Sequence, residues 1–190
     1  KCNMGMAYYE TRAGIRHPSL KYDLFGRLVE SCKRKDIAIS AYINVGLSHE
    51  QALRHRDWAL IWPEGYVHRP NPLDHFFRYM CYDTPYGDWI LEIVREVVSG
   101  YPVDGLFLDC FGVYLCVGVE CVQGMKARGW NPMDPQAQRV YAHERELRMA
   151  RRIVETARSI RPDLLFFFNG IPPEAQQDFC THFEFECLPT

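Results

Sequence analysis

One carboxylate in this 190-residue chain lies at the end of a predicted strand, a position that catalytic groups often occupy in parallel barrels. Asp109 ends the apolar run 103–109. Burying an unpaired carboxylate inside such a run would cost on the order of several kcal/mol. We therefore expect Asp109 to be functional or tightly paired, the structural alternative being a loop cap or an ion pair with an arginine. Asp104, at the start of the same run, is the better candidate for that structural role.

A second pair of acids lies near the end of the sequence. Glu184 and Glu186 are two residues apart in the alternating segment 181–186, so they share a face with His182. Carboxyl groups stacked on one face raise each other's pKa, which suits a general acid that works near neutrality. A solvated edge strand would produce the same alternation, and this alternative stays open.

Carboxylates on separate strands are what cleavage of a glycosidic bond requires. Asp109 with Glu186 or Glu184 supplies a nucleophile and an acid/base. A retaining reaction predicts carboxyl groups about 5 to 5.5 Å apart, and an inverting one about 6.5 to 9.5 Å. A serine-hydrolase elbow, Gly-x-Ser-x-Gly, is absent from the sequence, and the seven histidines show no His-x-His spacing. Glycosidic hydrolysis is therefore the favoured enzyme class.

A second hypothesis, that the chain is not an enzyme, stays open. In it the chain is a carbohydrate-binding barrel that keeps aromatic side chains for stacking on sugar rings but has no working acid pair. The aromatic residues that would do this are Tyr9, Trp62 and Tyr82.

Helices and strands alternate along the chain. Apolar runs predict strands at 37–45, 103–109, 164–169 and 181–186. Helical spacing predicts helices at 21–35, 86–99, 119–128 and 135–160. Such alternation is typical of parallel strands covered by helices.

The strands end in polar side chains, which points to a barrel. These side chains are Asn44, Asp109, Asn169 and Glu186, and the sequence has no Gly-rich phosphate loop after any strand. An α/β fold of the (β/α)₈ type, with its active site at the carboxyl ends of the strands, is therefore favoured over a doubly wound sheet. Residues 1–190 are expected to form one partial barrel domain, because a complete barrel typically has about 250 residues. The long segments 46–84 and 110–133 are expected to serve function.

Composition excludes several classes of partner. The 22 basic and 24 acidic residues give a net charge of -2, which disfavours nucleic acid, and no apolar stretch is long enough for a membrane span. Both termini are expected to lie inside a longer protein. Eight dispersed cysteines slightly favour a reducing compartment such as the cytoplasm for this soluble chain. Oligomeric state does not follow from these residues.

Neither a cofactor nor a metal is expected for the reaction. Cys110, Cys116 and Cys121 crowd one loop, where a structural zinc ion is an alternative to free or paired thiols. The C-x₄-C spacing without a second cysteine pair is a weak zinc pattern.

Several segments together resemble a known family. They are 1–9 (KCNMGMAYY), 17–18 (HP), 41–45 (AYINV), 101–109 (YPVDGLFLD), 168–170 (FNG) and 184–190 (EFECLPT). They resemble the bacterial family called hypothetical glycosyl hydrolase 6, which is similar to α-L-fucosidase-like barrels. The resemblance implies that the chain covers about strands two to six, with 103–109 as strand four and 181–186 as strand six.

The resemblance also implies roles for individual residues. The fucosidase-like nucleophile lies in an Asp-Gly-x-x-x-Asp pattern, which here ends at Asp109, and Glu186 takes the acid/base position. The relatives carry a histidine where this sequence has Asn3-Met4, so sugar recognition is expected to differ. The residues expected to hold substrate are Lys1, Asn3, Tyr9, Asn44, Asn169 and His182.

Overall fold

Three parallel strands form the centre of the fold. The structure, a computed structural model, describes residues 2–3, 5–67 and 77–185. Strands β4 (Ser40–Asn44), β5 (Gly105–Asp109) and β6 (Leu165–Phe168) are neighbours in the sheet and run in the same direction. Asn44 pairs with Asp109 in the register of β4 and β5. The three strands predicted from the longest apolar runs are therefore confirmed, and their polar ends lie together.

Short strands extend the sheet beyond β4. Strand β1 (Cys2–Asn3) pairs parallel to β4, β2 (Met6–Ala7) pairs antiparallel to β1, and β3 (Ile15–Arg16) pairs parallel to β2. The sheet order is β3-β2-β1-β4-β5-β6. The two-residue strands β2 and β3 have too few residues to show a periodic pattern, which is why the sequence did not predict them.

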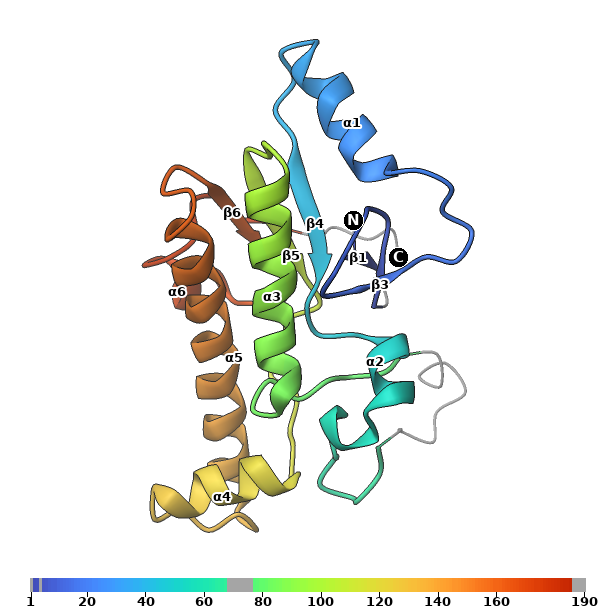
Figure 1. Ribbon diagram of the computed structural model, residues 1–190. Helices are drawn as coiled ribbons and strands as arrows, with labels where there is room; N and C mark the ends of the chain where they lie inside the picture. Colours follow the sequence, from blue (N-terminus) through green and yellow to red (C-terminus); the bar gives the residue numbers. More distant parts are fainter. Residues whose placement is uncertain (1, 4, 68–76, 186–190) are drawn as a thin grey trace, which may run out of the picture.

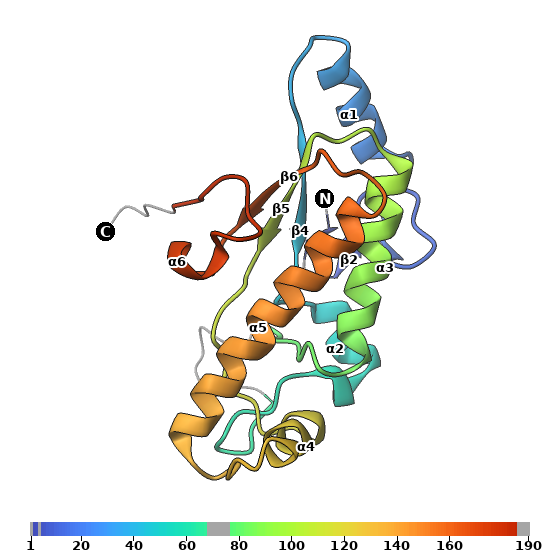
Figure 2. The ribbon, with the colours of Figure 1, turned by 90° about the vertical axis from the view of Figure 1, so that its left-hand side faces the viewer.

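Two long helices cover one face of the sheet. Figures 1 and 2 show α3 (Pro85–Gly100) and α5 (Pro135–Arg158) side by side against β4, β5 and β6. Each starts with a proline after a capping side chain, Thr84 for α3 and Asp134 for α5. Helix α1 (Leu24–Lys33) lies near the amino-terminal end of β4.

The alternation along the strands separates a helix-covered face from an open one. The fully buried strand side chains belong to the main core under the helices: Ala41, Ile43, Leu106, Leu108, Phe166 and Phe168. The side chains between them, Tyr42, Phe107 and Phe167, are only half-buried. They point to the opposite face, because successive strand residues alternate. The Tyr42 and Phe107 rings meet edge to face, 5.6 Å apart.

The two long segments after β4 and β5 contain short helices and their own small core. The first contains α2 (His49–Arg54) and the 3₁₀ helix η1 (Arg56–Trp58), and the second contains α4 (Val119–Ala127). Their shared core is separate from the main one and consists of Leu60, Trp62, Cys81, Cys116, Cys121, Met125 and Tyr141, the last from α5. We call it the loop core. Figure 1 shows α2 and α4 at the same end of the molecule, beyond the arrowhead of β4.

The fourth predicted strand is wrong over its described part. After α6 (Pro173–Gln176), residues 181–185 form no strand. The backbone N–H groups of Thr181 and His182 both donate to the carbonyl of Phe166, and the Thr181 hydroxyl contacts the backbone of that same residue. The hydrogen bonds of the segment thus reach the backbone of β6 at a single residue, so no ladder forms. Among the described helices, none is long and apolar enough to cross a membrane.

Candidate active site

The Asp109 carboxylate is held by donors from three strand ends. Its Oδ2 accepts from the Tyr42 hydroxyl at 2.5 Å. Its Oδ1 accepts from the Asn169 side-chain amide at 3.0 Å and from the backbone N–H of Cys110 at 2.8 Å. The side chain is half-buried on the face that the helices leave uncovered. A carboxylate with this many donors has a fixed orientation, which a nucleophile or general base requires.

Tyr42 is a site residue that the sequence analysis missed. Its pKa lies above the ordinary value of 10.0, first because of burial and then because its hydroxyl donates to the charged Asp109. The tyrosine therefore stays protonated and remains a donor. The signal was available in its position, since Tyr42 lies two residues before Asn44 on the same strand and so shares its face.

Asn44 and Asn169 reach the same edge but serve differently. Asn44 is almost fully buried; its amide nitrogen lies 3.2 Å from the Cys110 sulfur, and its oxygen accepts from the backbone N–H of Leu47. Asn44 thus fixes the turn after β4. Asn169 contacts the Asp109 carboxylate directly. The structure brings together three of the predicted residues, Asn44, Asp109 and Asn169. Of the two asparagines, Asn169 is the one that orients the Asp109 carboxylate.

The backbone around Asp109 is unusually tight. Cys110 has φ 61°, a left-handed conformation that side chains other than glycine rarely adopt. A Cβ on Gly46 would lie 1.8 Å from the Cys110 carbonyl oxygen, and one on Gly170 would lie 2.0 Å from the Phe111 carbonyl oxygen. Only glycine fits at either position. Strained backbone of this kind is concentrated at functional sites, which agrees with a catalytic role for this edge.

The predicted acid partners lie at the limit of the described chain. Glu184 is half-buried in the irregular segment after Thr181. Glu186, like Lys1, lies outside the described residues, and Asn3 is described only as part of the backbone of β1. His182 is exposed, and its ring stacks on Phe167 with 5.0 Å between centroids, on the open face of β6.

The three predicted stacking aromatics are buried. Tyr9, Trp62 and Tyr82 expose 1%, 4% and 4% of their surface. The Tyr9 hydroxyl donates to Glu96 on α3, and the ring packs against Phe25. None of the three presents a face to a sugar, so the expectation that Tyr9 contacts substrate does not agree with its place in the core. Large aromatic rings bury well, and sequence alone does not distinguish this use from stacking.

A second buried carboxyl was also missed. Glu146 on α5 is fully buried; His143 Nδ1 lies 3.8 Å from its Oε2, and among the described residues neither oxygen accepts a hydrogen bond of ordinary geometry. Burial raises its pKa from 4.5 to about 7, although the nearby charge of Arg145 and the backbone N–H of Gly112 act in the opposite direction. Its position in a polar helix, next to charged residues, gives no sequence signal of burial.

The cysteines group differently from the sequence expectation. The Sγ atoms of Cys81, Cys116 and Cys121 all lie within 4.8 Å of one another in the loop core. Cys81 takes the place expected for Cys110, which directly follows β5 and contacts Asn44 instead.

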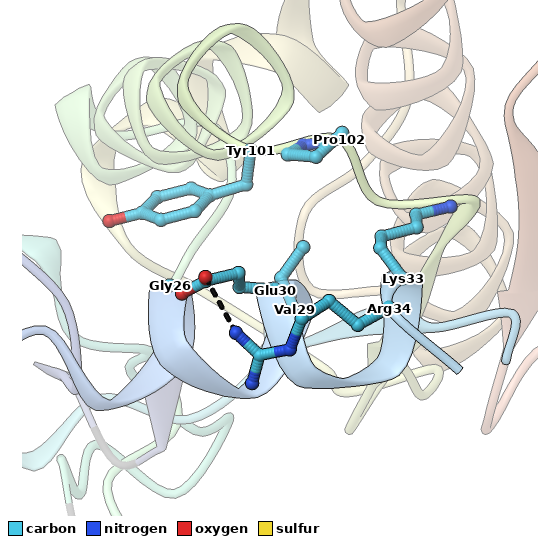
Figure 3. A pocket seen from close by; sticks show the side chains of 7 residues that line it. All are labelled: Gly26, Val29, Glu30, Lys33, Arg34, Tyr101 and Pro102. Atoms are coloured by element: carbon cyan, nitrogen blue, oxygen red, sulfur yellow. Dashed lines mark hydrogen bonds and ion pairs between the residues drawn. The ribbon is translucent and has the colours of Figure 1, made fainter. Parts of the chain in front are cut away.

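A pocket of about 480 Å³ lies at the other end of the sheet. Figure 3 shows it between α1 and the turn after α3, with the Glu30–Arg34 ion pair on one side and Tyr101 and Pro102 on the other. Its wall residues precede β4 and β5 in the chain, whereas Asp109 ends β5. The pocket is therefore separate from the candidate site.

Comparisons with known proteins agree with a hydrolase fold. The model of the family described as hypothetical glycosyl hydrolase 6 matches residues 1–110, whereas the comparison with curated protein sequences gives no match. The solved α-L-fucosidase isoenzyme 2 from Paenibacillus thiaminolyticus is similar with a TM-score of 0.82 and 29% identity, over 89% of this chain and 26% of the fucosidase. This chain thus spans about a quarter of that relative.

Two further structures are similar in fold alone. The glycoside hydrolase domain of PgaB from Bordetella bronchiseptica has a TM-score of 0.64 and 13% identity, over 87% of this chain and 50% of its own. A GH31 family sulfoquinovosidase from E. rectale has a TM-score of 0.58 and 17% identity, over 88% of this chain and 24% of its own.

Proposed function

Because this chain belongs to the hypothetical glycosyl hydrolase 6 family, we propose that it forms the catalytic part of a glycoside hydrolase with Asp109 as a catalytic carboxylate. The observation that carries the proposal is the Asp109 carboxylate, which Tyr42, Asn169 and the Cys110 backbone hold at the carboxyl end of β5. In parallel α/β folds this edge carries the active site. The substrate is a carbohydrate.

The frame of this site is one partial (β/α)₈ barrel domain over residues 1–190. Strands β1, β4, β5 and β6 are parallel neighbours in chain order, as successive barrel strands are. Helices α3 and α5 cover what would be the outer face. Tyr42, Phe107 and Phe167 then face the barrel interior, where layers of strand side chains pack. Asp109 lies above this layer, at the mouth.

The reaction we propose is retaining and α-L-fucosidase-like. Asp109 attacks the anomeric carbon while Glu186 or Glu184 protonates the leaving oxygen, and a covalent glycosyl-aspartate forms. The same glutamate then takes a proton from water, which displaces Asp109 and releases the sugar. Tyr42 and Asn169 orient the aspartate, and Lys1, Asn3 and His182 are proposed to contact sugar hydroxyls.

Substitution of the aspartate tests the assignment. We expect Asp109→Asn to lower kcat/KM on aryl glycosides, including an aryl α-L-fucoside, by at least about a thousandfold. Asp104→Asn, directly before the same strand, is the matched control. Asp104 accepts from Lys33 and from the Ile39 backbone at the opposite end of β5, so its loss should reduce stability and not turnover. Equal activity of wild type and Asp109→Asn would remove Asp109 from the mechanism.

A rescue experiment separates a nucleophile from a structural acid. The Asp109→Ala variant opens space where the carboxylate lay, and added azide should then restore turnover and give a glycosyl azide of inverted configuration. Failure of azide to restore any turnover in a folded variant would contradict nucleophilic attack by Asp109. Product configuration of the wild-type reaction, followed by NMR, tests retention independently.

A further inference from the structure

Three thiols from distant segments meet in the loop core. Cys81 lies shortly before α3, Cys116 lies between β5 and α4, and Cys121 lies in the first turns of α4. All three are buried, with at most 3% of their surface exposed. Their sulfur atoms lie within 4.8 Å of one another, and those of Cys81 and Cys121 are 3.4 Å apart. The proposed hydrolysis uses none of them.

These distances suit one tetrahedral metal ion. Zinc binds thiolate sulfur at about 2.3 Å, so two sulfurs on one ion lie about 3.8 Å apart. The Cys81 and Cys121 sulfurs are slightly closer than that value, at 3.4 Å, and no pair of the three is farther apart than 4.8 Å. The backbone N–H of Gly118 also donates to the Cys116 sulfur at 3.4 Å, a contact that favours a thiolate over a thiol.

A buried arginine lies beside the three sulfurs, and its positive charge requires a negative charge nearby. Arg145 exposes 2% of its surface, and its Nη1 lies 3.2 Å from the Cys121 sulfur and 3.9 Å from the Cys81 sulfur. Its Nη2 donates to the Tyr114 carbonyl, and its Nε has no hydrogen-bond partner in the described part of the chain. Burying an unbalanced charge is costly.

The charges of the three sulfurs and of Arg145 favour a bound divalent cation. Besides the buried Glu146 carboxyl near the same guanidinium, three neutral thiols add no negative charge to balance Arg145, and three bare thiolates exceed its charge by two. One Zn²⁺ bound to three thiolates has a net charge of −1, which balances Arg145. We propose that Cys81, Cys116 and Cys121 bind one structural zinc ion as thiolates. Asp83, whose Oδ2 lies 3.9 Å from the Cys121 sulfur, is a candidate for the fourth position, and Arg148, 2.6 Å from its Oδ1, balances its charge.

The ion would fasten the two long segments to each other. Cys81 belongs to the segment after β4, whereas Cys116 and Cys121 belong to the segment after β5. The core that these segments share is small, and small cores commonly need a metal or a disulfide for stability. A zinc ion bound here would therefore stabilise the loops that follow Asn44 and Asp109.

Metal analysis of the full chain tests the proposal directly. The chain is purified under reducing conditions from zinc-supplemented cells and measured by elemental analysis after gel filtration. We expect about one zinc per chain, released by a chelator with a fall in the melting temperature. Replacement by Co²⁺ should give the visible absorption of thiolate-bound tetrahedral cobalt. Wild-type protein that is folded and reduced, yet takes up neither ion, would overturn the proposal.

Cysteine variants identify the ligands. Cys116→Ser and Cys121→Ser should lose the zinc and the cobalt absorption. Cys32→Ser and Cys180→Ser are matched controls, because both cysteines are free, half-buried and lie outside the loop core. They should keep about one zinc per chain. Equal zinc loss in the controls would refute the ligand assignment, and the wild-type stoichiometry decides the matter even if the ligand variants fail to fold.

Discussion

The buried Glu146 carboxyl should make the stability of this chain depend on pH. Its side chain exposes 1% of its surface on α5, and burial raises its pKa from 4.5 to about 7. The folded state thus holds the proton more tightly than the unfolded state does. The stabilisation from the neutral carboxyl is full below about pH 4.5 and is lost as the pH rises to about 7. Above that pH the loss is constant.

The size of this effect follows from the two pKa values. One pKa unit corresponds to about 1.4 kcal/mol, so ionisation of Glu146 in the folded chain costs about 3 kcal/mol of unfolding free energy. Glu146→Gln is neutral at every pH and lacks this cost. Between about pH 5 and pH 8, we expect the variant to gain about 2 to 3 kcal/mol relative to wild type.

Urea unfolding followed by tryptophan fluorescence measures this gain. The comparison uses the difference between variant and wild type at the two pH values, so any pH-independent effect of the amide cancels. Glu155→Gln is the control, since Glu155 is exposed on the same helix. If the difference for Glu146→Gln were the same at both pH values, the raised pKa would be refuted.

Two further predictions concern the edge where Asp109 lies. Tyr42→Phe and Asn169→Ala each remove one donor to the carboxylate, and each should lower kcat/KM by about tenfold to a hundredfold without unfolding the chain; wild-type kinetics in both would show that these donors do not orient the acid. Gly170→Ala forces a Cβ against a backbone carbonyl at φ +99°, and should lower the unfolding free energy by about 2 to 4 kcal/mol in urea titrations. Gly100→Ala, where a Cβ meets no neighbouring atom, should leave stability unchanged or higher by up to about 1 kcal/mol, and a similar loss in both would contradict the steric reasoning.

Sequence periodicity predicted the parts of the fold that depend on local patterns. The long helices and the strands β4, β5 and β6 have apolar residues at regular spacing, and the structure has them within a few residues of the expected ranges. The polar ends Asn44, Asp109 and Asn169 do meet, because parallel neighbours place their carboxyl ends on one edge. Segment 181–186 had a strand pattern as well, but alternation alone does not provide a ladder partner.

Contacts between distant segments could not be predicted from the local sequence pattern. Cys81 joins Cys116 and Cys121 across 35 and 40 residues of sequence, and only the packing of the loop core brings them together. Glu146 likewise lies near the backbone of Gly112, which is distant from it in the sequence. Tyr9 shows the converse, since an aromatic residue near the expected site turned out to fill the main core.

The division of the chain into two hydrophobic clusters bears on how such an enzyme diversifies during evolution. Mutations in the loop core alter the segments that follow Asn44 and Asp109 and leave the main core around the strands unchanged. Under the proposed function, natural selection can therefore change these segments, and with them the preferred sugar, while the contacts of Asp109 are inherited unchanged. Lineages that share the strand framework would then differ mainly in residues 46–67 and 110–134.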